Sequence, residues 1–262
     1  ILLVVNAVNT EKIFGHLRNV APKGIEVTNL TDRVGQIAVQ GPRSRELLLA
    51  SDLCSPVRDT LAELGYYHFI TFDRKGSEII LSRTGYTGEL GYEIYLPGDQ
   101  SLEVWNEFLD CGGQMGVGPI GLGARDTLRF EASYCLYGHE LSEDISPLEA
   151  GLSWVVKLKK NDFIGQSALV AEKEAGPARK LVGFEIEGRK IARQGYRVIS
   201  GDRDVGEVTS GTFAPTLKKS LSMALVLSSV PDDEDDLAVD IRDKYVPVRR
   251  VKLPFYKGTI KD

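Results

Sequence analysis

The chain has 262 residues, a length that fits one large domain or two modest ones. Hydrophobic residues make up 42% and charged residues 26%, which is typical of a globular protein with a sizeable core. The net charge of −5 lacks the basic excess typical of nucleic-acid surfaces, and even the longest apolar runs, such as Ile1 to Val5, are far shorter than the ~20 residues that span a membrane.

The expected elements alternate irregularly over the first two-thirds of the chain. Strands are expected at residues 1–5, 24–30, 36–39, 78–83 and 92–96, and helices at residues 9–21, 43–50, 101–111 and 124–136. The run Ile1–Val5 predicts a fully buried strand, which needs partners on both sides, so we expect the sequence to begin inside a domain. The pattern indicates an α+β domain and not a regular βαβ repeat.

The pattern of expected elements changes near Lys180, where short strands separated by turns begin. Strands are expected at residues 181–186, 196–199, 205–208, 223–227, 238–241 and 246–251. This pattern predicts a small C-terminal all-β barrel or sandwich. The stretch 173–180, which contains Gly176-Pro177, is the expected linker, so the predicted domains are residues 1–176 and 177–262.

The three cysteines and three histidines are scattered, with no Cys-x-x-Cys pair. This usage fits reduced thiols in a cytosol-like compartment, and its spacing predicts no metal site. There is also no Gly-x-Ser-x-Gly, P-loop or His-Glu-x-x-His motif. An enzyme with this sequence would therefore depend on substrate geometry and on an acid–base carboxyl group.

The segment from Thr84 to Glu93 is dense in glycine. One interpretation is a hairpin loop, because glycine adopts positive φ at low cost. Glu93 lies in an apparent strand, where alternation places it beside Tyr95 on one face and Ile94 on the other. Its carboxylate faces either solvent or a pocket, where it would suit a heterocycle with paired N–H donors, such as an amino-pyrimidinone edge.

A glycine turn precedes the expected helix 124–136. Gly121 to Asp126 matches the dinucleotide-binding pattern only weakly, because its sixth position is Asp126 instead of glycine. Residues 124, 128, 132 and 135 are expected on one buried face of the helix, with Arg125 and Arg129 on an adjacent face. An arginine in the first turn can hold a carboxylate or phosphate, or simply form a surface salt bridge.

Taken together, an ordered series of motifs over nearly the whole chain resembles the aminomethyltransferases of the glycine cleavage system, the T-proteins. The motifs are residues 3–7, 38–42, 85–89, 121–131, 136–138, 146–150, 163–165 and 208–211. The resemblance implies a channel between the domains that binds tetrahydrofolate. It also implies transfer of an aminomethyl carbon from the lipoyl arm of the H-protein to the folate, with release of ammonia, in the bacterial cytoplasm or the mitochondrial matrix.

Residue by residue, Glu93 resembles the acid that accepts hydrogen bonds from the pterin edge, and Tyr86 resembles the tyrosine of the folate pocket. Arg125 matches the arginine at the benzoylglutamate end, and Asn6 matches an asparagine near the pterin. Arg193 resembles the arginine beside the incoming lipoyl arm. The family's key aspartate belongs to an Asp-Asp motif upstream of residues 3–6, so we expect it to lie before Ile1.

Three alternatives share this scaffold. The first is the folate domain of sarcosine and dimethylglycine dehydrogenases and related demethylases. The second is a catalytically inactive folate-binding module. The third is the folate-binding protein of iron–sulfur cluster maintenance, against which the stretch Asn161–Gln166 counts, because it lacks that protein's cysteine motif.

Overall fold

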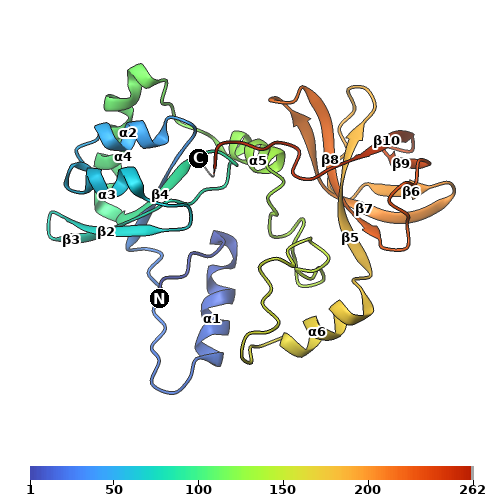
Figure 1. Ribbon diagram of the computed structural model, residues 1–262, viewed down its shortest axis with the longest axis horizontal. Helices are drawn as coiled ribbons and strands as arrows, with labels where there is room; N and C mark the ends of the chain where they lie inside the picture. The colour runs from blue at the N-terminus through green and yellow to red at the C-terminus, as the bar shows by residue number, and fades with distance from the viewer. Residues whose placement is uncertain (261–262) are drawn as a thin grey trace. The chain divides into compact units, whose positions relative to one another are not determined.

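The computed structural model describes residues 1–260, which form two compact units. The first unit contains residues 1–120 and the C-terminal segment from residue 258, and the second contains residues 121–257. Figure 1 labels the α-helices and most of the strands of both. The predicted boundary at residue 176 stays a prediction.

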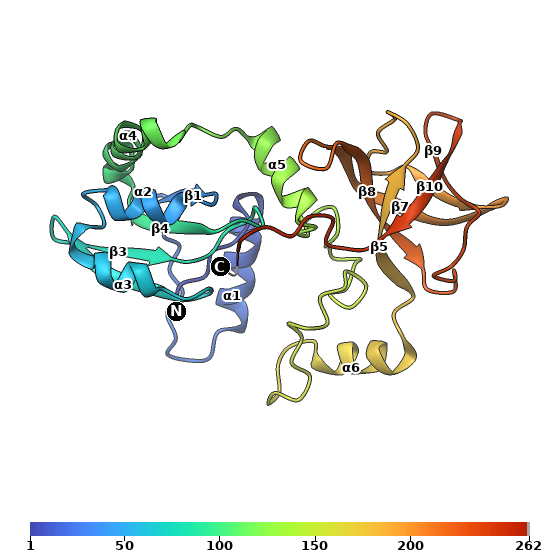
Figure 2. The ribbon, with the colours of Figure 1, turned by 45° about the horizontal axis from the view of Figure 1, so that its top comes forward.

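The first unit is built on a four-stranded antiparallel sheet with the order β1-β4-β3-β2 (Figure 2). Its strands are β1 (Val34–Gln40), β2 (Phe69–Arg74), β3 (Ser77–Ser82) and β4 (Gly91–Pro97). Its α-helices are α1 (Thr10–Val20), α2 (Ser44–Ala50), α3 (Arg58–Glu63) and α4 (Ser101–Gly112). Short 3-10 turns are η1 (Ala7–Asn9), η2 (Ser55–Val57), η3 (Gly98–Gln100) and η4 (Gly113–Met115).

One face of this sheet forms the core of the first unit. Ile94 on β4 and Leu81 on β3 are fully buried against Leu48 of α2, Leu61 of α3 and Val104 of α4. On β4, Glu93 and Tyr95 alternate with these core positions, are only half-buried and occupy the opposite face. Glu93 therefore lies on the face opposite to Ile94 and its contacts with α2, α3 and α4, and the alternation predicted these opposite faces for Glu93 and Ile94.

Two expected strands are wrong. Residues 1–5 have no regular secondary structure, and their apolar side chains are exposed, from 37% at Val5 to 122% at Ile1. Residues 24–30 are also irregular. Within the part of the chain that the structure describes, no strand pairs with either run, and an apolar run without a ladder partner does not become a strand.

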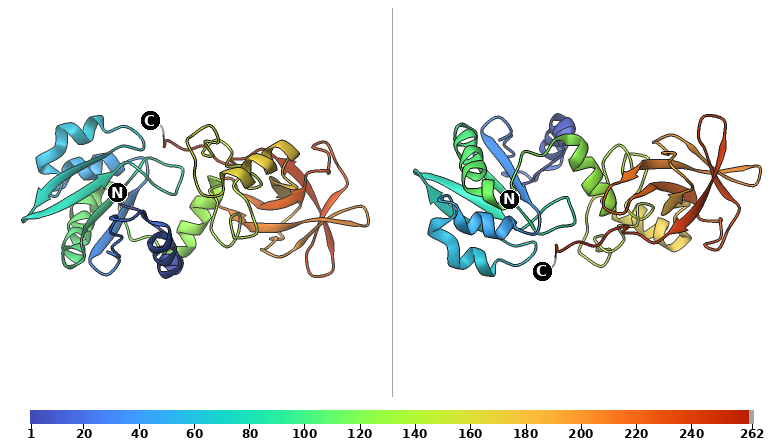
Figure 3. Two further views of the ribbon diagram at one scale, coloured as in Figure 1. Left: turned by 90° about the horizontal axis from the view of Figure 1, so that it is seen from below. Right: turned by 90° about the horizontal axis from the view of Figure 1, so that it is seen from above.

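The second unit begins with α5 (Leu122–Glu131) and α6 (Gln166–Ala175) and ends in a closed antiparallel barrel with the order β10-β5-β8-β7-β6-β9. Figure 3 shows the barrel from two sides. Its strands are β5 (Arg179–Ile186), β6 (Arg197–Ser200), β7 (Arg203–Ala214), β8 (Lys219–Leu227), β9 (Leu237–Asp240) and β10 (Tyr245–Val251). The predicted α+β region and C-terminal barrel are confirmed.

The inward-facing apolar side chains of the barrel strands fill its interior, among them Phe184, Val198, Val208 and Val239, all fully buried. A second, smaller cluster joins Phe130 of α5 to Met223 of β8. This cluster holds the C-terminal half of α5 against the barrel, next to the polar network described below.

Candidate functional site

Glu93 is the centre of a polar cluster on the exposed face of the first unit's sheet. Its carboxylate accepts a hydrogen bond from the side-chain amide of Gln36 on β1, with 3.0 Å between Nε2 and Oε1. The other carboxylate oxygen accepts hydrogen bonds from the hydroxyls of Thr84 and Tyr95, the latter at 3.4 Å. Within residues 1–260 no cation forms an ion pair with Glu93. The carboxylate is therefore oriented by neutral donors alone.

The position of Tyr95 beside Glu93 affects the pKa of its phenol. Burial, and secondly the charge of Glu93, raise the pKa of the Tyr95 phenol from 10.0 to about 12. A phenol with this pKa stays protonated at neutral pH and keeps donating to the carboxylate.

The glycine-rich loop that follows β3 is fixed by Gln40 at the end of β1. The Gln40 amide donates to the backbone oxygens of Thr84 (3.3 Å) and Tyr92 (3.1 Å). Cβ atoms at Gly85 or Gly91 would overlap the Gln40 side chain, so both glycines are needed for this close approach. The Gln40 side chain therefore ties the two ends of the loop together.

Tyr86 is half-buried on this loop. The loop is also held by the C-terminal segment, because Glu89 accepts hydrogen bonds from the backbone N–H (3.1 Å) and hydroxyl (2.6 Å) of Thr259. Asn6 stands apart from this cluster. It is exposed, and its side chain does not cap η1.

In the second unit, α5 is shorter than expected and buries a different face. It ends at Glu131, followed by Ala132 and by Ser133, whose φ of 57° breaks the helix. Ala124 is exposed, whereas the C-terminal turn of α5 is buried. The predicted buried face is therefore wrong. Its physical reason is that Arg129 points inward to carboxylates, which makes the inward face partly polar.

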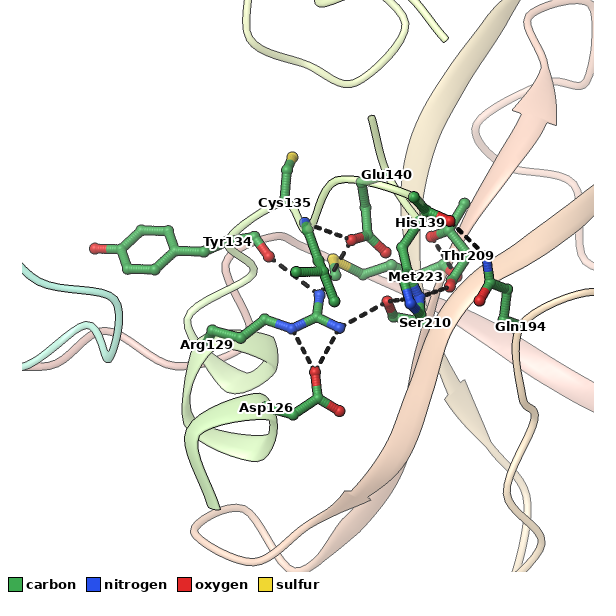
Figure 4. A network of polar contacts seen from close by, with 12 residues as sticks. Asp126, Arg129, Tyr134, Cys135, His139, Glu140, Gln194, Thr209, Ser210 and Met223 are labelled. Carbon is green, nitrogen blue, oxygen red and sulfur yellow. Dashed lines mark hydrogen bonds and ion pairs between the residues drawn. The ribbon is translucent and has the colours of Figure 1, made fainter. Parts of the chain in front are cut away.

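The helical spacing predicts that Arg125 and Arg129 lie on the same face of the helix. In the structure their environments are opposite. Arg125 is exposed at the start of α5, where its backbone N–H donates to the carbonyl of Gly121 at 3.0 Å. Arg129 is only 2% exposed and lies at the centre of the network in Figure 4. Its ion-pair partners are Glu140, at 3.1 Å, and Asp126, at 2.7 Å.

The guanidinium of Arg129 uses every one of its N–H groups. Nε and one Nη2 hydrogen point to Asp126, and the other Nη2 hydrogen goes to Ser210 at 3.0 Å. Nη1 donates to Glu140 at 3.1 Å and to the backbone oxygen of Tyr134 at 3.2 Å. A guanidinium has five N–H donors, so none is left for a ligand. Arg129 is a structural support that joins α5 to β7.

A cavity of about 330 Å³ opens beside this network. Its lining residues come from α5, from the turns around residues 139 and 194, and from β7: Asp126, Arg129, Phe130, His139, Arg193, Gln194, Ser210, Gly211 and Thr212. Arg193 is exposed and forms no ion pair with any residue in the described range. It is therefore the cation of this pocket that is available to a ligand.

His139 has a defined tautomer in this wall. Its Nδ1 lies 2.9 Å from the backbone oxygen of Thr209, and a carbonyl oxygen can only accept, so Nδ1 carries the proton. The pocket wall therefore contains an imidazole ring, hydroxyls and a guanidinium, a set of groups that can bind a polar ligand.

Residues 1–160 match the family described as the GCVT N-terminal domain, and residues 179–257 match the glycine cleavage T-protein C-terminal barrel domain. The chain belongs to the glycine cleavage T-protein family. An aminomethyltransferase of Pseudothermotoga lettingae is 49% identical over 99% of this chain and 70% of its own length. A second, from Halothermothrix orenii, is 44% identical over 97% of this chain and 70% of its own length.

A solved structure supports the same assignment. The crystal structure of glycine cleavage system aminomethyltransferase T from Bartonella henselae matches with a TM-score of 0.84 and 29% identity, over 97% of this chain and 68% of that chain. The predicted membership of the T-protein family is thus confirmed. No described helix is long and apolar enough to cross a membrane, and the described residues hold no group of three or more potential metal ligands.

In this T-protein chain the Glu93 carboxylate is half-buried and forms no ion pair with a described residue. Its two oxygens have more acceptor sites than the three donors occupy. The roles of Glu93 and Tyr86 as ligand contacts stay predictions, and the sequence alone did not single out Gln36, Thr84 and Gln40, which surround them. Their signal is weak, because a polar residue on a strand face is usually solvated.

Proposed function

We propose that this chain moves an aminomethyl carbon from the lipoyl arm of an H-protein to tetrahydrofolate, with release of ammonia. The observation that carries the proposal is the Glu93 carboxylate, which neutral donors hold in place without compensating its charge. Membership of the T-protein family supports the reaction class. Tetrahydrofolate, when bound, supplies the nitrogen that accepts the carbon.

Each predicted residue has a separate role in this proposal. Glu93 accepts two hydrogen bonds from the pterin edge, with Tyr86 and Asn6 as further contacts of the ring. Arg125, which is exposed on α5, binds the carboxylates of the benzoylglutamate tail. Arg193, at the cavity of the second unit, contacts the lipoyl arm. Positioning of the two reactants supplies a large share of the rate.

Calorimetric titration with tetrahydrofolate tests the role of Glu93. Glu93→Gln keeps the shape of the side chain but replaces one acceptor oxygen with a donor, so we expect the Kd to rise about 10- to 100-fold. Glu78→Gln, an exposed carboxylate on β3, is the matched control and leaves the Kd unchanged. Equal affinity of Glu93→Gln and the unaltered chain would overturn the proposed folate site.

Ligand truncation tests Arg125 independently. Arg125→Gln should weaken tetrahydrofolate binding about tenfold or more, because a charge-assisted hydrogen bond is lost. The same substitution should leave the binding of a tetrahydropterin without the benzoylglutamate tail unchanged. If both ligands lose affinity equally, Arg125 does not bind the tail.

Aminomethyl transfer is measured with an aminomethylated H-protein as donor and tetrahydrofolate as acceptor, by release of ammonia. A positioned acid–base group contributes typically ~10²–10⁴-fold to such proton transfers. Transfer at full rate by residues 1–262 would show that no carboxyl group before Ile1 is required. Folate binding without any transfer would favour an inactive folate-binding module.

A further inference from the structure

We propose that Gln194 is a positioning residue, whose side-chain amide fixes the turn carrying Arg193 to the carbonyl of Gly138 and so orients Arg193 in the cavity of the second unit. This inference rests on the proposed role of Arg193 toward the donor. Its structural half, that Gln194 restrains the turn, can be tested without any donor.

The hydrogen bond between Gln194 and Gly138 is short and is made by an exposed side chain. Nε2 of Gln194 donates to the backbone oxygen of Gly138 at 2.7 Å. Gly138 has a φ of +91°, a backbone conformation that favours glycine and that presents this carbonyl. Gln194 is exposed, so its replacement removes a hydrogen bond without opening a cavity in the core.

The acceptor belongs to a segment that several further hydrogen bonds hold in place. The N–H of Gly138 donates to the backbone oxygen of Leu141 at 2.6 Å. The next residues along the chain, His139 and Glu140, are bound to Thr209 on β7 and to the buried Arg129. Gln194 therefore connects its turn to the segment that holds this network, in which Arg129 and Glu140 are buried (Figure 4).

The two ends of the Arg193 turn are fixed by β7. On one side Ala192 is fully buried, and a Cβ at Gly211 would overlap its carbonyl oxygen. On the other side the backbone N–H of Gly195 donates to Val208 at 2.9 Å. Gln194 restrains the tip between these two anchors. Because Arg193 follows Ala192 directly, this restraint limits the directions in which its guanidinium points.

The consequence for the proposed reaction is specific to the donor. A mobile Arg193 must be ordered again each time a donor binds, which costs conformational entropy. Loss of the Gln194 contact should therefore raise the KM for the donor more than it lowers kcat. Binding of tetrahydrofolate, which the proposed function assigns to Glu93 and Arg125, should not change.

Amide hydrogen exchange on the whole chain tests the restraint. Gln194→Met keeps the length of the side chain but removes the donor, and we expect exchange at the amides of Gly195 and Tyr196 to become about 2- to 10-fold faster. Gln194→Lys supplies a new N–H donor and should restore slow exchange. Gln166→Met is the matched control. It removes a glutamine that donates to the backbone oxygens of Leu158 and Lys160, and it should leave the Arg193 turn unchanged.

The outcomes separate this inference from the proposed function. Unchanged exchange in Gln194→Met overturns the restraint, whatever the activity of the chain. Faster exchange with an unchanged donor KM overturns the positioning role. If the unaltered chain transfers no aminomethyl group, the proposed function fails, while the exchange data still decide whether Gln194 restrains the turn.

Discussion

Arg129 and Glu140 form an ion pair of 3.1 Å in which the two side chains are 2% and 0% exposed. The same Glu140 oxygen also accepts the backbone N–H of Leu136 at 3.0 Å. Two charges at this depth are tolerable only as partners, since an isolated buried charge is strongly unfavourable. The pair therefore links α5 to the turn that carries His139 and Gly138.

Replacing Arg129 by Met should lower the free energy of unfolding by about 3–5 kcal/mol, because it leaves Glu140 as an uncompensated buried charge. The double variant Arg129→Met with Glu140→Leu should recover part of this loss. Urea denaturation measures both. Arg43→Gln, which breaks an ion pair whose side chains are both 53% exposed, is the control and should have no measurable effect. An equally small effect of Arg129→Met would show that the pair is not important for stability.

The sequence predicted the elements that depend on local patterns. The helix at 101–111 and the strand at 92–96 are confirmed as α4 (Ser101–Gly112) and β4 (Gly91–Pro97). Alternation also placed Glu93 and Ile94 on opposite faces, as the structure shows. Such patterns repeat within a few residues, so the sequence displays them directly.

Contacts between distant residues could not be predicted in this way. Arg129 donates a hydrogen bond to Ser210, which is 81 residues away in the sequence, and Glu93 accepts one from Gln36, which is 57 residues away. Nothing in the periodicity of α5 shows that Arg129 is buried and Arg125 is not. The strand predicted at Ile1–Val5 is wrong for a related reason, because local propensity does not show whether a pairing partner exists.

From the contact between Glu93 and Tyr95 we predict how the pKa of Tyr95 changes when the carboxylate is removed. The pKa of Tyr95 is raised from 10.0 to about 12 by burial and by the neighbouring carboxylate. Glu93→Gln removes the carboxylate charge and should lower that pKa, whereas burial keeps it above 10.0. Ultraviolet titration, as the difference between each protein and its Tyr95→Phe variant, measures both values. The same pKa in both proteins would exclude a charge effect.

The sign of the linkage for Tyr95 follows from the same values. The folded state holds the proton more tightly than the unfolded state, so the contribution of Tyr95 to stability is fully present below pH 10.0 and is lost as the pH rises toward about 12. The Tyr95→Phe variant should show a weaker loss of stability over this range.

From the ion pair between Glu149 and Arg179 we predict how the stability of the fold depends on acid pH. Arg179 donates to both carboxylate oxygens of Glu149, at 2.8 and 2.9 Å, and these hydrogen bonds hold the pKa of Glu149 below 4.5. The folded state therefore binds this proton less tightly than the unfolded state. Its contribution to stability is present above pH 4.5 and is lost as the pH falls through the lowered pKa.

Glu149→Gln should accordingly lower the free energy of unfolding at neutral pH by about 1–3 kcal/mol and flatten its dependence on acid pH. Denaturation curves at a series of pH values measure both effects. Glu174→Gln, an exposed carboxylate on α6, is the matched control and should leave the pH dependence unchanged. A steep acid loss that persists in Glu149→Gln would assign that loss to other carboxylates.

Two glycines of the second unit should respond oppositely to alanine. A Cβ at Gly211 would overlap the backbone oxygen of Ala192, which cannot move aside like a flexible side chain, so Gly211→Ala should cost about 1–3 kcal/mol. A Cβ at Gly123 in α5 meets nothing within 4 Å, so Gly123→Ala should stabilise by about 0.5–1 kcal/mol through helix propensity. Thermal unfolding compares the two. Because Gly211 contacts the residue before Arg193, its variant should also speed hydrogen exchange at Gly195, and normal exchange in a destabilised Gly211→Ala would show that the turn does not depend on this contact.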